Sequence, residues 1–150
     1  MRRRRTPATV LALTAGLALA GCSSGADAGA ELKAGDGYVP QPVTADMASG
    51  YLVVKNTGDT ADKLTSVTSD ISDDVTLHKT VGSTMRPVET LEIPANGELE
   101  LGRGGSHLML MKLKHKPTKG EKVSLELRFA TTDPIKLDVP VEAANYTPKK

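Results

Sequence analysis

Short apolar runs separated by turn residues are the feature that most restricts the fold of this 150-residue chain. Two runs, over 122–130 and 135–141, alternate strictly between apolar residues and others. A period of two is the signature of a half-buried β-strand, and no stretch of the folded part shows the 3.6-residue period of an amphipathic helix. Turn signals recur roughly every 8 to 12 residues, which predicts an all-β protein, an antiparallel sandwich or barrel. Further strands are expected over 50–55, 63–68, 74–81, 88–93, 98–101 and 105–113.

Residues 1–21 have the organisation of an export signal. Arg2 to Arg5 are a basic start, and Val10 to Ala20 are an apolar run too short to remain as a membrane-spanning helix. The following Leu19-Ala20-Gly21-Cys22 resembles the lipobox of bacterial lipoproteins. That resemblance implies cleavage before Cys22, lipid on its sulfur, and an extracytoplasmic protein anchored to the cell membrane. An ordinary secreted protein is the alternative, and the arginines leave export by the Sec or the twin-arginine route open.

The mature chain is expected to be one domain on a tether. Removing residues 1–21 changes the formal net charge from +1 to −3, with 15 Lys and Arg against 18 Asp and Glu. No basic stripe with interleaved aromatic residues is present, so nucleic acid is not an expected partner. The segment 22–36 is rich in Ser, Gly, Ala and Asp and is predicted to be flexible. The β-sandwich domain is expected over 37–143, and 144–150 is expected to be a frayed tail.

Cys22 is the only cysteine, so the exported domain has neither a disulfide nor a thiolate ligand. A blue-copper electron-transfer site requires a cysteine thiolate and is therefore excluded. Any copper site in this domain must use His, Met or carboxylate side chains.

The stretch from Gly105 to Leu113 carries the first candidate ligands. On a strand, His107, Met109 and Met111 point to one side, and Leu108, Leu110 and Lys112 point to the other. A thioether is a poor ligand for hard cations and a good one for Cu(I). The alternative is a buried strand in which Met only fills space. Met111, on the same face, is interpreted as packing in the core or beside the site, with direct ligation as the alternative.

His78 and Met85 are the other candidates. Alternation places His78 on the other face of its strand from Val75 and Leu77, which are expected to face the core. A turn at 82–83 would bring Met85 back towards His78. Taken singly, each has a simpler interpretation, as a solvated strand residue and a gap filler. His115 lies among three lysines and is interpreted as a solvated turn residue.

Taken together, His78, Met85, His107 and Met109 resemble the ligand pattern of the periplasmic copper chaperone family called PCuAC. Twenty-one residues separate Met85 from His107, as in that family, and the resemblance covers roughly 48–141, including YLVVKNTGD and Met-Arg-Pro-Val. The sequence departs from the family between His78 and Met85, where it has six residues instead of about ten. An even deletion, taken equally from the two arms of a hairpin, preserves the face on which Met85 lies. Lys79 also stands where the family often has Glu.

The resemblance implies a cupredoxin-like, Greek-key β-sandwich that holds Cu(I) through these four side chains. Cu(II), bound by the two histidines with water or the N-terminal segment, is an alternative. The implied function is a copper chaperone that supplies a partner such as the copper centre of cytochrome c oxidase, alongside Sco-type proteins. A structural or adhesive sandwich without metal, and a copper storage or scavenging protein, are the competing hypotheses. No enzyme is expected, because no nucleophile motif, phosphate loop or distinctive carboxylate pair is present.

Overall fold

The computed structural model describes residues 29–149, whose regular secondary structure consists of ten β-strands. No helix occurs among these residues, so the predicted all-β class is confirmed. The strands are β1 (Leu32–Pro40), β2 (Met47–Asn56), β3 (Asp62–Ser69), β4 (Ser72–Val81), β5 (Thr84–Val88), β6 (Leu91–Ile93), β7 (Gly97–Leu101), β8 (His107–Leu113), β9 (Lys122–Phe129) and β10 (Ile135–Glu142).

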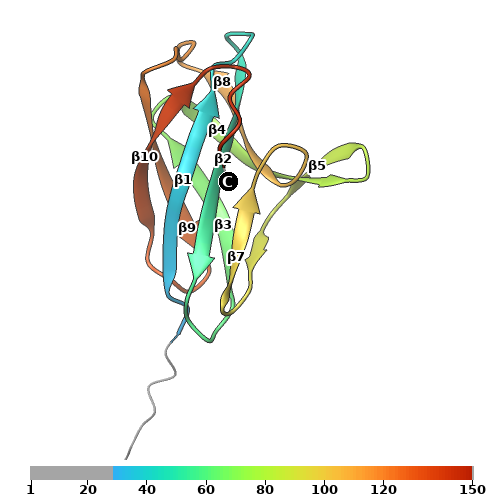
Figure 1. Ribbon diagram of the computed structural model, residues 1–150, viewed down its shortest axis with the longest axis vertical. Helices are drawn as coiled ribbons and strands as arrows, with labels where there is room; N and C mark the ends of the chain where they lie inside the picture. Colours follow the sequence, from blue (N-terminus) through green and yellow to red (C-terminus); the bar gives the residue numbers. More distant parts are fainter. Residues whose placement is uncertain (1–28, 150) are drawn as a thin grey trace, which may run out of the picture.

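The strands form one continuous hydrogen-bonded path that folds into a sandwich (Figure 1). Its order is β5-β4-β8-β2-β1-β10-β9-β3-β6, with β7 also paired to β2. A short turn at 70–71 joins β3 to β4, which are far apart along the path but in contact, so the path curls back on itself. All pairings are antiparallel except that of β1 with β10. The predicted antiparallel sandwich is thus confirmed, with one parallel pair added.

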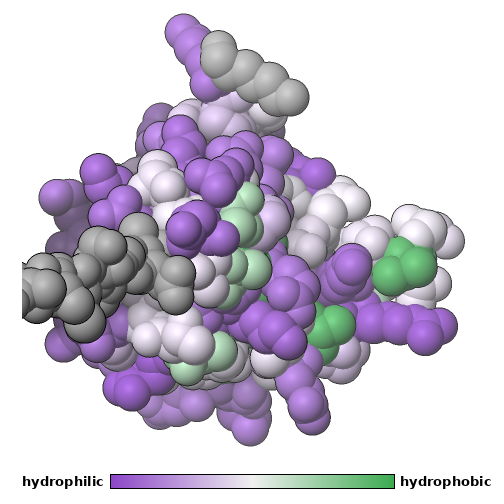
Figure 2. Space-filling model, turned by 90° about the horizontal axis from the view of Figure 1, so that it is seen from below, coloured by the Kyte–Doolittle hydropathy of each residue, from purple (hydrophilic) through white to green (hydrophobic). Residues whose placement is uncertain are grey.

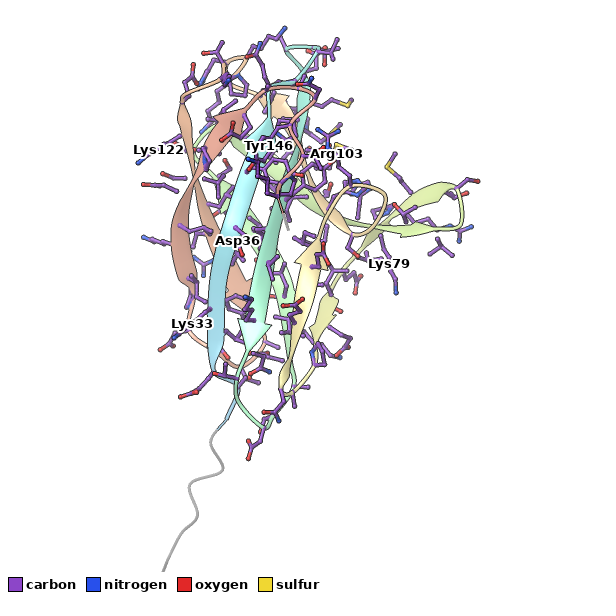
Figure 3. All side chains as sticks on the ribbon, viewed as in Figure 1. Lys33, Asp36, Lys79, Arg103, Lys122 and Tyr146 are labelled. Atoms are coloured by element: carbon purple, nitrogen blue, oxygen red, sulfur yellow. The ribbon has the colours of Figure 1, made fainter. Side chains whose placement is uncertain are left out.

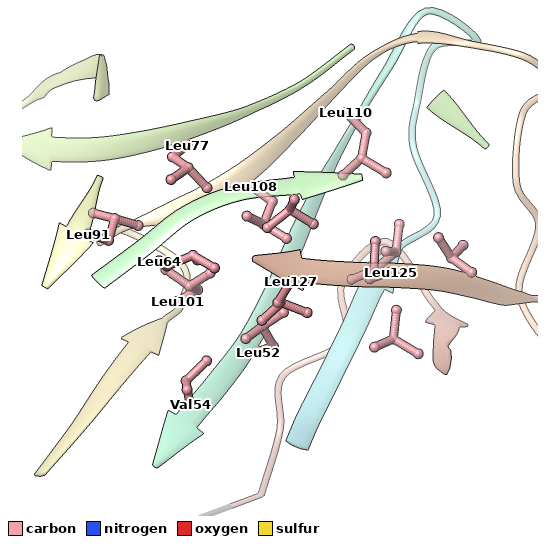
Figure 4. Close-up of a cluster of buried hydrophobic side chains, with 14 of the residues drawn as sticks. Leu52, Val54, Leu64, Leu77, Leu91, Leu101, Leu108, Leu110, Leu125 and Leu127 are labelled. Atoms are coloured by element: carbon pink, nitrogen blue, oxygen red, sulfur yellow. The ribbon is translucent and has the colours of Figure 1, made fainter. Parts of the chain in front are cut away.

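The core lies between the layers and is built almost entirely from Leu, Val and Ile (Figure 4). The alternation read from the sequence of β9 holds, because its four apolar residues are all buried. On β8, the fully buried side chains are Leu108 and Leu110. Successive residues of a strand face opposite sides, so His107, Met109 and Met111 lie on the side of β8 turned away from this core.

The folded part begins earlier than expected. β1 starts at Leu32, inside the segment 22–36 predicted to be a tether, and pairs with β2 from Leu32↔Asn56 onwards. Leu32 and Ala34 pack against the core. The polar composition of the segment suggested flexibility, but pairing with β2 and these two apolar contacts order it.

The expected strand over 88–93 is wrong, because two strands in different layers meet there. β5 ends at Val88 and pairs with β4, whereas β6 begins at Leu91 and pairs with β3. Glu89 and Thr90 make the crossing between the layers.

The C-terminal segment packs on the domain instead of fraying throughout 144–149. The Tyr146 ring lies edge-on to that of Tyr38, with centroids 5.0 Å apart. Arg103 donates from Nη2 to the carbonyl oxygen of Ala144 at 2.8 Å, and its guanidinium lies over the ring of Tyr51. Figure 3 shows Tyr146 and Arg103 side by side in front of β1 and β2. Aromatic packing and one charge-assisted hydrogen bond therefore hold a segment that its sequence alone marked as a tail.

The proposed signal peptide and Cys22 lie outside the described residues. Within 29–149, no helix has the length and apolar character needed to cross a bilayer.

Candidate metal centre

The centre of the candidate site is a direct cross-strand pair of histidines. His78 of β4 lies opposite His107 of β8 in the antiparallel register. Directly opposed residues of an antiparallel pair project to the same face. The two imidazoles are stacked, with ring centroids 5.4 Å apart and planes inclined by 30°. Two histidines separated by 28 residues in the chain are thus neighbours, with their nitrogens in one small volume.

A backbone carbonyl fixes the tautomer of His107. Nδ1 of His107 lies 3.1 Å from the carbonyl oxygen of Gly105, which can only accept, so Nδ1 carries the proton. Nε2 is then left with a free lone pair. The same carbonyl accepts a hydrogen bond from Oγ1 of Thr80 on β4 at 3.0 Å. A histidine ligand whose second nitrogen donates to a carbonyl is a recurring arrangement in metal sites, because it orients the ring.

His78 has a buried nitrogen without a partner. Its Nε2 lies 3.0 Å from Oγ1 of Thr76, two residues earlier on β4. Its Nδ1 is the one buried side-chain nitrogen or oxygen in the described part of the chain that makes no hydrogen bond. An unsatisfied buried polar atom costs about 1–3 kcal/mol, so it calls for an explanation such as an ion that the site would bind. Burial, together with the adjacent His107, lowers the pKa of His78 and keeps the ring neutral, as a metal ligand must be.

Met109 is the next residue on the same face of β8. It lies opposite Thr76 of β4 and Ser49 of β2, and its side chain is half-buried. Residues two apart on a strand are separated by about 6.7 Å. The thioether of Met109 is therefore next to the histidine pair, on the side away from the β4–β5 turn.

Met85 shares this face and lies on the other side of the histidine pair. The β4–β5 hairpin projects from the sandwich as an arm (Figure 1), and its two-residue turn is 82–83, as expected. Gly82, the first turn residue, has φ +63°, a conformation that glycine adopts without strain. Met85 lies opposite Thr80, and Pro87 lies opposite His78, so Met85 is the diagonal neighbour of His78 towards the turn. Met85 is 60% exposed, and Figure 2 shows apolar surface on this arm.

The structure thus places the four predicted ligands on one face of three adjacent strands. It brings His78, His107 and Met109 into direct succession and leaves Met85 beside them, exposed. Thr76 and Gly105, which contact the two imidazoles, were not singled out from the sequence. His115 lies elsewhere, exposed, with Nε2 3.2 Å from Oε2 of Glu121. Lys79, whose side chain leaves the other face of the hairpin, marks its base in Figure 3.

The donor set suits a soft monovalent ion. Two imidazoles and thioethers are neutral, and thioether sulfur selects Cu(I) over hard divalent cations. Residues 29–149 contain no cluster of three or more His, Cys, Asp and Glu side chains that could hold a metal. A site on this face would therefore depend on its methionines.

Residues 32–141 match the LpqE-like family, described as "Putative lipoprotein LpqE-like". A relative from Leifsonia xyli subsp. xyli, described as "Putative lipoprotein Lxx21020", is 37% identical over 103 residues. That alignment spans 64% of this chain and 61% of the relative's length.

Several solved structures share the fold. The apo PCuAC domain of PmoF2 superposes with a TM-score of 0.67 and 22% identity, covering 77% of this chain and 92% of that domain. The copper-bound form of the PmoF2 domain gives a TM-score of 0.66 and 23% identity over 75% of this chain and 92% of that one. The solution structure of Cu(I)-bound DR1885 from Deinococcus radiodurans gives 0.64 and 27% identity, over 75% and 78%. These likenesses confirm the predicted β-sandwich of the PCuAC type.

Proposed function

Because this chain belongs to the LpqE-like family and has the fold of copper-binding PCuAC domains, we propose that it is a copper chaperone that binds Cu(I) outside the cytoplasm. The observation that carries the proposal is the direct pairing of His78 with His107, with Met109 next along the same face. Two imidazoles and one thioether are neighbours on that face, and one imidazole nitrogen, Nδ1 of His78, is buried without a partner.

The hydrogen bonds around the pair support specific ligand atoms. With Nδ1 of His107 donating to Gly105, its Nε2 is the atom left to bind copper. With Nε2 of His78 hydrogen-bonded to Thr76, its Nδ1 is the nitrogen whose lone pair is left to bind copper. The Met109 sulfur supplies a third ligand. These partners prepare neutral, oriented ligands before the ion arrives, which reduces the cost of binding.

We assign Met85 the role of a fourth, mobile ligand. Its exposure and its place on a projecting hairpin leave the side chain free to turn towards His78 or away from it. Thioether side chains are flexible and adapt to changing geometry. A ligand that can leave the ion without disturbing the core would provide a position through which a partner enters.

Delivery, rather than storage, is the function we favour. All four donors are neutral, and such ligands hold copper less strongly than thiolates do. The exposed arm beside the site makes the ion accessible to another protein. The resemblance to copper chaperones suggests a recipient such as the copper centre of cytochrome c oxidase, with Sco-type proteins as further candidates.

A Cu(I) titration of the mature chain tests this function. The protein should compete under anaerobic conditions with a chromogenic Cu(I) chelator and bind the first equivalent tightly, while Zn(II) at the same concentration should not displace it. The preference follows from the thioether ligand. Failure to withdraw Cu(I) from the weakest chelators of a graded series would overturn the assignment.

Membrane attachment through Cys22 is a separate part of the proposal. Replacing Cys22 with Ser removes the only sulfur that could carry the lipid, so the variant should move from the membrane fraction to the soluble extracytoplasmic fraction. Fractionation with a salt wash, followed by immunoblotting, measures the change. Retention of the Cys22→Ser variant on membranes would show that another feature anchors the protein.

A further inference from the structure

All the methionines of the described chain lie on one outer face of the sandwich. They are Met47, Met85, Met109 and Met111. None belongs to the hydrophobic core, although filling gaps in cores is the usual role of methionine. The strand pairings put them on the face that carries His78 and His107. The proposed Cu(I) site uses Met85 and Met109, which leaves Met47 and Met111 without a role.

Met47, Met111 and Met109 form a compact triangle. Met47 of β2 lies directly opposite Met111 of β8. Opposed residues of an antiparallel pair have Cβ atoms about 5 Å apart, and Met109 follows about 6.7 Å along the same strand. Each thioether lies three bonds beyond its Cα, so the three sulfurs can reach one point above the sheet. Met47 is 44% exposed, and the side chains of Met109 and Met111 are half-buried, so this point is accessible from solvent.

A hollow in the surface borders two corners of this triangle. It has a volume of about 320 Å³, and its walls include Met47, Ser49 and Met109, whereas Met111 lies outside it, on the far side of Met47. The thioether of Met109 thus borders both the histidine pair and this hollow. Asp74 lies opposite Met111 from the other neighbouring strand, and Lys112 pairs with it at 3.1 Å. Because the Asp74 carboxylate is paired with Lys112, the thioethers are the groups at this place that are suited to bind a soft ion.

We propose that Met47, Met109 and Met111 form a second, weaker Cu(I) site next to the first. This inference rests on the proposed function, since the ion is the same and Met109 is shared. Three neutral sulfurs without an imidazole suit Cu(I) or Ag(I) and do not suit Zn(II). The transfer is a ligand exchange without oxidation or reduction: the Met109 sulfur stays bound while Met47 and Met111 replace the histidine nitrogens, or the reverse. The second site therefore serves as a waiting position for copper entering or leaving the histidine pair.

Methionine-methyl NMR of the mature protein tests the second site directly. With ¹³C-labelled methionine methyl groups and anaerobic Cu(I), the first equivalent should shift the Met109 signal and the signals of the His78 and His107 rings. The second equivalent should shift the signals of Met47 and Met111. Ag(I), which is stable in air, should reproduce both steps.

A matched pair of double variants separates the two sites. Met47→Leu with Met111→Leu preserves volume and apolar character, and should abolish the second equivalent while the first remains. His78→Gln with His107→Gln should weaken the first step while Met47 and Met111 still respond to metal. A second equivalent that persists in the Leu variant, or moves neither Met47 nor Met111, would overturn the second site and leave the first intact. If the unaltered protein bound no first equivalent of Cu(I) at the histidine pair, that result would instead contradict the proposed function.

Discussion

Replacing His107 with Gln should lower the affinity for Cu(I) by roughly a hundredfold or more, equivalent to about 2.7 kcal/mol. Removing a group that only orients a metal ligand already costs about 10- to 100-fold in affinity, so removing the ligand itself should cost at least the upper end of that range. Gln keeps a side chain of similar length with an amide donor that can replace the hydrogen bond to Gly105. The affinity is measured by anaerobic competition with a Cu(I) chelator.

His115→Gln is the matched control. His115 is exposed and pairs with Glu121, outside the proposed site, so its replacement should leave the affinity unchanged. Because His107 is 5% exposed, thermal unfolding of the metal-free His107→Gln variant must accompany the titration. A variant that unfolds at the same temperature and still binds Cu(I) like the unaltered protein would exclude His107 as a ligand.

The faces of the site strands could be predicted from the sequence because side-chain direction depends only on a period of two. Leu108 and Leu110 marked the core side of β8, which placed His107 and Met109 together on the other side. The same reasoning placed the side chain of His78 on the face of β4 away from Leu77. These assignments need no knowledge of which strands are neighbours, and the structure confirms them.

The pairing of His78 with His107 was not predictable from the residues alone. It depends on the register between β4 and β8, which are separated in the chain by three other strands. A shift of two residues would keep every side chain on its face but would place His107 opposite Thr76 or Thr80. The role of Gly105 was equally hidden, since its contribution is a backbone carbonyl that any residue type could offer.

β1 was not predicted from the sequence, and β5 was predicted only as the second arm of a hairpin, for different physical reasons. β1 contains Lys33, Asp36 and two glycines, so its composition is polar, and its order comes from pairing with β2 and β10 together with the packing of Leu32 and Ala34 against the core. β5 is an almost wholly exposed strand at the end of the sheet path, where Pro87 is tolerated because an edge strand needs fewer ladder hydrogen bonds. Both strands are stabilised by neighbours that a local pattern does not show.

Acidification should release the copper steeply. A histidine ligand must be neutral, so each one raises the apparent dissociation constant by up to tenfold per pH unit below its own pKa. Protonation of His78 in the metal-free protein therefore predicts a loss of affinity of up to about tenfold per pH unit from this residue alone. Because burial and the neighbouring His107 lower the pKa of His78, its contribution should begin below about pH 6.5, the ordinary histidine value. Competition titrations between pH 7.5 and 5 measure the slope.

Two variants distinguish protonation of the ligands from acid unfolding. His78→Gln should lower the pH dependence of the copper affinity by one proton per bound copper. Met109→Leu should lower the affinity by the same factor at every pH, because a thioether does not titrate.

The lowered pKa of His78 also affects the stability of the metal-free protein. Its contribution to stability is complete above the unfolded-state value of about 6.5 and is lost as the pH falls through the folded-state value, because the unfolded chain takes up the proton more readily. The His78→Gln protein should therefore lose less stability than the unaltered protein over that pH range. In the copper titrations, an identical pH dependence of affinity in both proteins would rule out His78 as a ligand.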